Sequence, residues 1–157
     1  MSLYAQLSQP EFLLRSWRFV KSRKGVSGVD GQDIEMFRRR RDRNILKLSE
    51  DLKSERYSPS FLRGIKISKD NGRFRRLGIP TIEDRVVFQG AHRLLSELWE
   101  PLFAPLSFVY RPGRSISDAV AAVAERIRSG KTWFVKGDIR GCFDRRQIGR
   151  ASCRERV

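Results

Sequence analysis

The residues whose types and spacing most suggest chemistry lie between Trp133 and Asp144. Trp133, Phe134 and Val135 are strand-forming residues and predict a buried β-strand, which would end at the carboxylate of Asp138. A carboxylate at the mouth of a buried strand is costly unless it is paired, and a hard divalent cation such as Mg²⁺ is one suitable partner. Two interpretations of this segment stay open: Asp138 binds a metal ion, or it caps a turn or pairs with an arginine.

The composition indicates a polyanionic partner. The 157 residues include 33 Lys and Arg against 18 Asp and Glu, so the formal net charge is +15. This excess favours nucleic acid over an anionic membrane, and no apolar run approaches the length of a membrane span. Cys142 and Cys153 form neither a metal-ligand spacing nor a disulfide framework, and the N-terminus lacks a signal-peptide pattern, so we expect a cytoplasmic location and no membrane partner.

Helices separated by a glycine-containing loop are predicted at the N-terminus. Apolar positions predict a helix over residues 3–24 that is interrupted near Pro10, and Gly25, Gly28 and Gly31 predict the loop. A second helix is predicted over residues 33–53, with Asp33 as its N-cap. It carries a basic run made of Arg38, Arg39, Arg40 and Arg41. This run is either a solvated helix face or a phosphate-contacting patch.

A basic β-hairpin follows. Residues 62–69 and 73–80 are β-patterned runs on either side of an Asn71-Gly72 step, which is a strong hairpin signal. One acid, Asp70, accompanies six basic residues: Arg63, Lys66, Lys69, Arg73, Arg75 and Arg76. Alternation predicts one packed face and one basic face. The alternative is a solvated hairpin whose charges bind nothing.

Two further helices complete the predicted α+β fold. One begins at Thr81 or Ile82 and ends before Pro101, and the other begins at Ser115 or Ser117 and ends near Ser129. His92, the single histidine, has no catalytic partner pattern, and we expect it to be structural or exposed.

Five segments in sequence order resemble the reverse transcriptases of bacterial group II introns and related retroelements. They are Gly28-Val-Asp-Gly31, Arg76-Leu-Gly-Ile-Pro80, Thr81-Ile-Glu-Asp-Arg-Val-Val87, Tyr110-Arg-Pro-Gly-Arg-Ser115 with Asp118-Ala119, and Gly137-Asp-Ile-Arg-Gly-Cys-Phe-Asp144. The resemblance covers residues 10–145. It implies an N-terminal extension over residues 1–55, fingers over 56–130, and the start of a polymerase palm, with its first strand, over 131–145. Residues 146–157 are rich in arginine and lack an apolar stripe, so we expect a non-native or frame-shifted tail on a truncated chain.

The resemblance also implies roles for individual residues. Asp138 matches the first metal-binding, catalytic aspartate of the palm, where two Mg²⁺ ions are expected in the complete enzyme. Lys69, Arg75 and, less closely, Arg63 match residues that hold the incoming dNTP, and Phe143 matches the aromatic gate that excludes a 2′-hydroxyl. The residues expected to contact nucleic acid are Arg38, Arg39, Arg40, Arg41, Lys66, Arg73, Arg76, Arg111 and Arg114.

The function implied is that of an RNA-directed DNA polymerase, which adds dNTPs to a DNA primer on an RNA template. Structured intron RNA is a further expected partner. Only the first metal-binding aspartate is present in the sequence, so we expect the chain to be inactive alone. The alternative is a non-catalytic RNA-binding module, such as a maturase-type splicing cofactor. The sequence leaves open whether the parent protein serves an intron, a diversity-generating element or a CRISPR adaptation system.

Overall fold

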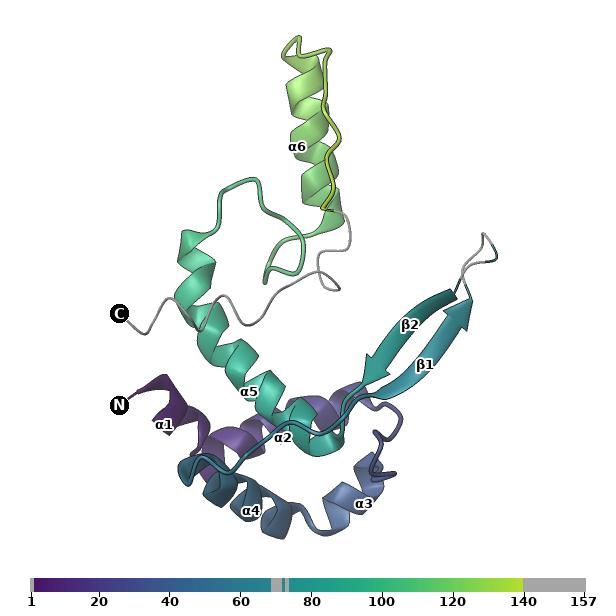
Figure 1. Cartoon of the computed structure of the whole chain (residues 1–157). Coiled ribbons are helices and arrows are strands. Elements are labelled where there is room, and N and C mark those ends of the chain that lie inside the picture. Colours follow the sequence, from purple (N-terminus) through teal and green to yellow (C-terminus); the bar gives the residue numbers. More distant parts are fainter. Residues whose placement is uncertain (1, 69–71, 73, 140–157) are drawn as a thin grey trace, which may run out of the picture. The chain divides into compact units, whose positions relative to one another are not determined.

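The computed structural model describes residues 2–68, 72 and 74–139, and the chain divides into two compact units, Met1–Phe103 and Ala104–Val157. The described elements are six α-helices, one short 3₁₀ helix and a two-stranded antiparallel sheet (Figure 1). The predicted α+β class is therefore confirmed. Within the described part of the chain, no helix combines the length and the apolar character needed to span a bilayer.

The first two helices of unit 1 are separated where the sequence predicts a break. α1 (Leu3–Leu7) ends before α2 (Pro10–Arg23), and Pro10 occupies the first turn of α2, where its missing N–H costs nothing. α2 buries Leu13, Trp17 and Val20, which are spaced at three to four residues and so share one face of the helix. The opposite face carries the basic residues.

The prediction of a single helix over residues 33–53 is wrong in one respect, because the helix is divided at Arg40. α3 (Ile34–Arg39) begins after Asp33, whose carboxylate accepts a hydrogen bond from the Met36 N–H at 2.7 Å, and α4 (Arg41–Lys53) follows. In an uninterrupted helix, position 41 would lie between the buried residues Phe37 and Ile45 on the same face. The break leaves the Arg41 side chain exposed and paired with Asp42, so no guanidinium is buried.

The core of unit 1 joins helices that are distant in the sequence. Trp17 of α2 and Phe37 of α3 stack with their ring centroids 4.4 Å apart, and both side chains are almost fully buried. α2 also packs against α4 and α5 (Ile82–Trp99), as Figure 1 shows. The buried apolar residues are Leu7, Leu13, Trp17, Val20, Phe37, Ile45, Leu48, Leu52, Ile82, Val86, Val87 and Leu94.

The predicted hairpin is confirmed and leads directly into α5. β1 (Arg63–Ser68) pairs antiparallel with β2 (Phe74–Ile79). Pro80 follows β2, and Thr81 then caps α5 by accepting a hydrogen bond from the Asp84 N–H at 3.2 Å. A 3₁₀ helix, η1 (Glu100–Leu102), ends α5 at Pro101, as predicted.

Unit 2 contains one described helix, α6 (Ile116–Arg128), which begins with a Ser115–Asp118 capping box. The strand predicted to begin at Trp133 and end at Asp138 is wrong. Residues 131–139 form neither a helix nor a strand, and Trp133, Phe134 and Val135 are 95%, 89% and 99% exposed. A strand needs a neighbour to satisfy its backbone N–H and C=O groups, and the described residues of unit 2 provide none.

Candidate nucleic-acid interface

The register of the hairpin divides its basic residues between two faces. Lys66 lies directly opposite Arg76, and both residues are exposed. Arg63 pairs with Ile79, and Arg75 pairs with Ile67, which places these two arginines at register positions on the other face. The prediction of a single basic face is therefore wrong. The two arginines that match dNTP-binding residues lie on one face, and two of the predicted nucleic-acid contacts lie on the other.

Arg63 joins the hairpin to the glycine-containing loop. Its Nη1 donates hydrogen bonds to the backbone oxygen of Ser27 at 3.2 Å and to the Ser27 hydroxyl at 3.4 Å. From the start of α5, Arg85 donates to the backbone oxygens of Val26 at 2.5 Å and Pro80 at 3.0 Å. Two arginines thus hold the loop against the strand and the helix start.

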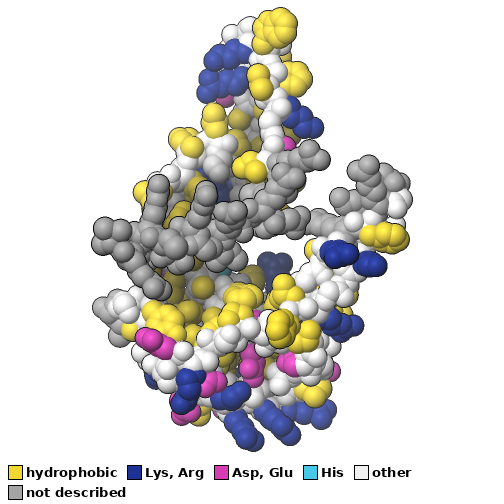
Figure 2. All heavy atoms as spheres, in the orientation of Figure 1, with side chains coloured by type: hydrophobic (Ala, Val, Ile, Leu, Met, Phe, Trp, Pro, Cys, Tyr) yellow, Lys and Arg dark blue, Asp and Glu magenta, His cyan; other side chains and the backbone are white. Residues whose placement is uncertain are grey.

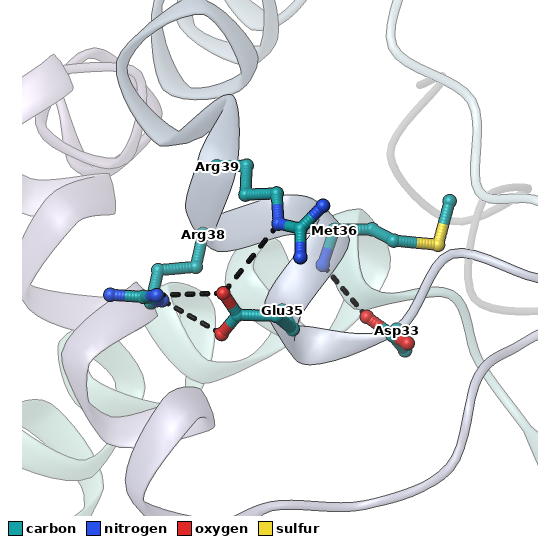
Figure 3. Close-up of polar contacts among 5 residues, drawn as sticks. All are labelled: Asp33, Glu35, Met36, Arg38 and Arg39. Carbon is teal, nitrogen blue, oxygen red and sulfur yellow. Dashed lines mark hydrogen bonds and ion pairs between the residues drawn. The ribbon is translucent and has the colours of Figure 1, made fainter.

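The basic run at the junction of α3 and α4 is partly neutralised by neighbouring acids. Arg38 donates two hydrogen bonds to Glu35, at 2.6 and 2.8 Å, and Arg39 lies 3.7 Å from the same carboxylate (Figure 3). Arg41 forms a similar two-point contact with Asp42. The hydrogen bond from Arg38 lowers the pKa of Glu35. These pairs are solvent-exposed, so a phosphate can compete for the same guanidinium groups.

A mixed but mainly cationic surface results. Figure 2 shows Lys and Arg side chains, with Asp and Glu among them, along the edge that α3 and α4 form in unit 1, and further Lys and Arg side chains on the hairpin. Arg40, at the break between the two helices, is exposed, and no ion pair to it occurs among the described residues. Of the predicted contacts, Arg38, Arg39, Arg40 and Arg41 are exposed at the junction of α3 and α4, and Lys66 and Arg76 are exposed on the hairpin.

The two predicted contacts in unit 2 have local partners. Arg111 donates hydrogen bonds from Nη1 to the backbone oxygens of Ala104 at 3.0 Å and Ser107 at 2.8 Å. The Arg114 guanidinium lies over the Phe108 ring, 5.8 Å from its centroid. Both contacts organise the segment that precedes α6. Arg111 in particular holds a turn, and this use of its guanidinium was not evident from the sequence.

Asp138 is exposed in the segment that follows α6. The described residues contain no group of three His, Cys, Asp or Glu side chains that could hold a metal ion. Mg²⁺ is commonly held by one or two carboxylates together with waters and substrate phosphates, and Asp138 offers one carboxylate of this kind. Lys69, Arg73, Phe143 and the predicted tail over residues 146–157 lie outside the described residues, and of Arg75 only the backbone is described.

A buried polar cluster at the start of α5 was not predicted. Asp84 is 2% exposed and accepts hydrogen bonds from the hydroxyls of Tyr57 and Thr81, both at 2.7 Å, and from the Ser60 N–H at 3.2 Å. These donors satisfy a carboxylate that would otherwise be costly to bury. The Thr81-x-x-Asp84 spacing signals the helix cap, but Tyr57 and Ser60 are too distant in sequence to be inferred.

Comparisons with known proteins give the family of the chain. No protein-family model matches the chain. It is 34% identical over 145 residues to the group II intron-encoded protein LtrA of Lactococcus lactis subsp. cremoris, which covers 90% of this chain and 24% of LtrA. The chain belongs to the family of group II intron-encoded proteins. It is also 35% identical over 144 residues to protein YkfC of Escherichia coli K12, which covers 88% of this chain and 38% of YkfC.

A third relative comes from a eukaryote. An uncharacterized 91 kDa protein in the cob intron of Schizosaccharomyces pombe is 34% identical over 116 residues, which covers 74% of the chain and 13% of that protein. The chain thus spans between about a quarter and two-fifths of the length of LtrA and YkfC. The predicted membership of this family is confirmed.

Proposed function

We propose that the chain is the RNA-binding part of an RNA-directed DNA polymerase of the group II intron type. The observation that carries the proposal is the pair of exposed cations, Lys66 and Arg76, that face each other across the hairpin. Among the described residues neither forms an ion pair with an acid. Like charges directly opposite one another destabilise a strand pair, and a bound phosphate would relieve this repulsion. The net charge of +15 supports the same conclusion.

The opposite face of the hairpin is proposed to approach the incoming dNTP. Arg63 and Arg75 occupy register positions on that face, and cationic groups there would neutralise a triphosphate. Arg63 already donates a hydrogen bond to the Ser27 backbone oxygen, so we propose that it also positions the glycine-containing loop. The roles of Lys69 and Phe143 rest on the family resemblance. The proposed partners are an RNA template, a DNA primer, dNTPs and structured intron RNA.

The division into N-terminal extension, fingers and palm rests on the same resemblance. Nucleotide addition is not assigned to the described residues, because Asp138 is the one predicted metal ligand among them. Asp138 stays a predicted metal ligand of the complete polymerase.

RNA binding is tested by titrating a fluorescently labelled structured RNA with the full chain at increasing KCl concentrations. Contacts to phosphates should make the logarithm of the association constant fall by about 0.7–0.9 per contact for each unit of log salt. An association constant that hardly changes between low and physiological salt would contradict the proposal.

Direct binding of a dNTP distinguishes the proposed polymerase from the alternative, a non-catalytic RNA-binding module. A fluorescent dNTP should bind the chain, and the substitution Arg75→Gln should weaken this binding. RNA binding without any dNTP binding would favour a non-catalytic RNA-binding module of the maturase kind.

A further inference from the structure

A groove of about 420 Å³ lies between α2 and α5. Phe19, Val20 and Arg23 line it from the last turns of α2, and Phe88 and His92 line it from one face of α5. Val20 is buried, whereas Phe19 and Phe88 are 42% and 46% exposed. The groove therefore combines an apolar base with two accessible aromatic rings, and its volume falls within the range of about 300–1,000 Å³ that is common for small-ligand sites.

The charged residues that line the groove are cations. They are Arg23, Lys24 and Arg85, and no Asp or Glu is among the described lining residues. The Arg23 guanidinium lies over the Phe19 ring, 5.0 Å from its centroid. Aromatic rings and guanidinium planes are the surfaces on which proteins stack unpaired bases of RNA, and cations at the edge suit the adjoining phosphates.

The end of α2 is held in an unusual backbone conformation at this groove. Lys24 has φ = 53°, in the left-handed region that is unfavourable for a residue with a side chain, and Gly25 follows with φ = 128°. Arg85 fixes the next turn of the chain through its hydrogen bond to the Val26 oxygen. The loop is thus already ordered beside the groove.

We propose that this groove binds one unpaired nucleotide of RNA. The base stacks on Phe88 with the Arg23–Phe19 pair beside it, and the phosphate lies next to Lys24. The proposal rests on the RNA-binding function proposed above and names a single-stranded subsite within it. A simpler explanation is that Arg23 and Lys24 only stabilise the negative end of the α2 dipole, and the experiment must separate the two.

The first variant removes a ring and keeps an apolar side chain. Binding to the full chain is measured by fluorescence anisotropy with a labelled single-stranded oligouridylate and with an RNA duplex of the same length. Phe88→Leu should weaken binding of the single strand about five- to a hundredfold and leave duplex binding nearly unchanged. The matched control is Trp99→Leu, which removes a 56% exposed ring from the same helix outside the groove and should change neither affinity.

The second variant separates binding from stability. Lys24→Gly relieves the left-handed backbone, so the thermal midpoint of unfolding should stay the same or rise, whereas the affinity for the single strand should fall and the salt slope should decrease by about 0.7. Lys53→Gln removes the same charge outside the groove and should reduce the affinity for the single strand less.

If Phe88→Leu and Lys24→Gly bind the single strand as well as their controls do, the groove is not a nucleotide site, although RNA binding by the wild type still stands. If the wild type shows no salt-dependent RNA binding, the proposed function itself fails.

Discussion

Gly28 lies directly against the backbone of Thr81. A methyl group on Gly28 would fall 2.7 Å from the Thr81 Cα and 2.8 Å from its backbone nitrogen, both well inside van der Waals contact. The loop that precedes α3 therefore lies so close to Thr81, the N-cap residue of α5, that no side chain fits between Gly28 and Thr81. Hydrogen bonds from Arg63 to Ser27 and from Arg85 to Val26 fix the two residues that directly precede Gly28. Two segments that define the family in sequence thus meet in space.

Gly28→Ala should lower the free energy of unfolding by about 1–3 kcal/mol, because the added methyl group overpacks against backbone atoms that cannot rotate away. Urea denaturation followed by circular dichroism measures the change. Gly64→Ala is the control, since nothing lies within 4 Å of a Cβ at that position. This control should leave stability unchanged or raise it by up to about 1 kcal/mol. Equal stabilities for the two variants would contradict the close contact.

Tyr57→Phe should destabilise the chain by about 1–3 kcal/mol, because it removes a hydrogen bond to the buried carboxylate of Asp84. Tyr4→Phe is the matched control. The Tyr4 hydroxyl donates to the neutral backbone oxygen of Leu52 at 2.8 Å, so its loss should cost less. Denaturation of the wild type, Tyr57→Phe and Tyr4→Phe at neutral pH gives the free energy of unfolding of each protein. A larger loss for Tyr4→Phe would mean that the Asp84 cluster does not stabilise this unit.

The alkaline stability of the wild type should also depend on Tyr57. Burial and the hydrogen bond to Asp84 raise the pKa of the Tyr57 hydroxyl above its ordinary value of 10.0. Since the folded-state pKa is raised, the stabilising contribution is complete below the unfolded pKa and is lost as pH rises beyond it. The difference in stability between wild type and Tyr57→Phe should therefore be constant from pH 7 to about 9.5 and narrow above about pH 10. A difference that widens in alkali would show that the sign of the pKa shift is wrong.

Lys66→Gln should raise stability slightly while weakening RNA binding. The substitution removes a like-charge pair with Arg76, which is worth about 0.2–1 kcal/mol at directly opposed positions in a sheet. The same substitution removes a predicted phosphate contact, so the salt slope of RNA binding should become shallower. Thermal melts and RNA titrations on the same preparation measure both effects. Loss of stability without any change in RNA affinity would indicate that Lys66 has only a structural role.

Asp138→Ala should change neither the unfolding transition nor RNA affinity, because Asp138 is exposed and forms no ion pair with the described residues. We also expect no primer extension by the chain with an RNA template, dNTPs and Mg²⁺. Primer extension by the wild type that disappears in Asp138→Ala would show that this chain builds a complete catalytic site.

Local patterns were sufficient to predict most elements of unit 1. The interruption near Pro10, the cap at Asp33, the helix start at Thr81 or Ile82 and the Asn71-Gly72 step each depend on neighbours within a few residues, so the sequence contains their full physical cause. The break at Arg40 was missed because local helix propensity does not reveal that position 41 would face the buried Trp17–Phe37 stack. The strand over residues 133–138 was wrongly predicted because Trp133, Phe134 and Val135 favour strands, whereas a strand forms only when another strand satisfies its backbone.

By itself, the sequence determined the α+β class, the family and the excess of positive charge, all of which depend on composition or on short ordered segments. The tertiary structure alone decided how each cation is used. Arg63 and Arg85 hold a loop, Arg111 holds a turn, and Lys66 and Arg76 stay exposed without an acid partner among the described residues. It also decided that Asp84 is buried beside Tyr57 and that Phe19 and Phe88 share a groove. The physical reason is that charge is a property of the residue type, whereas burial and hydrogen-bond partners depend on how the chain folds. The partners of Arg63, Arg85 and Asp84 in particular include residues 24 to 59 positions away.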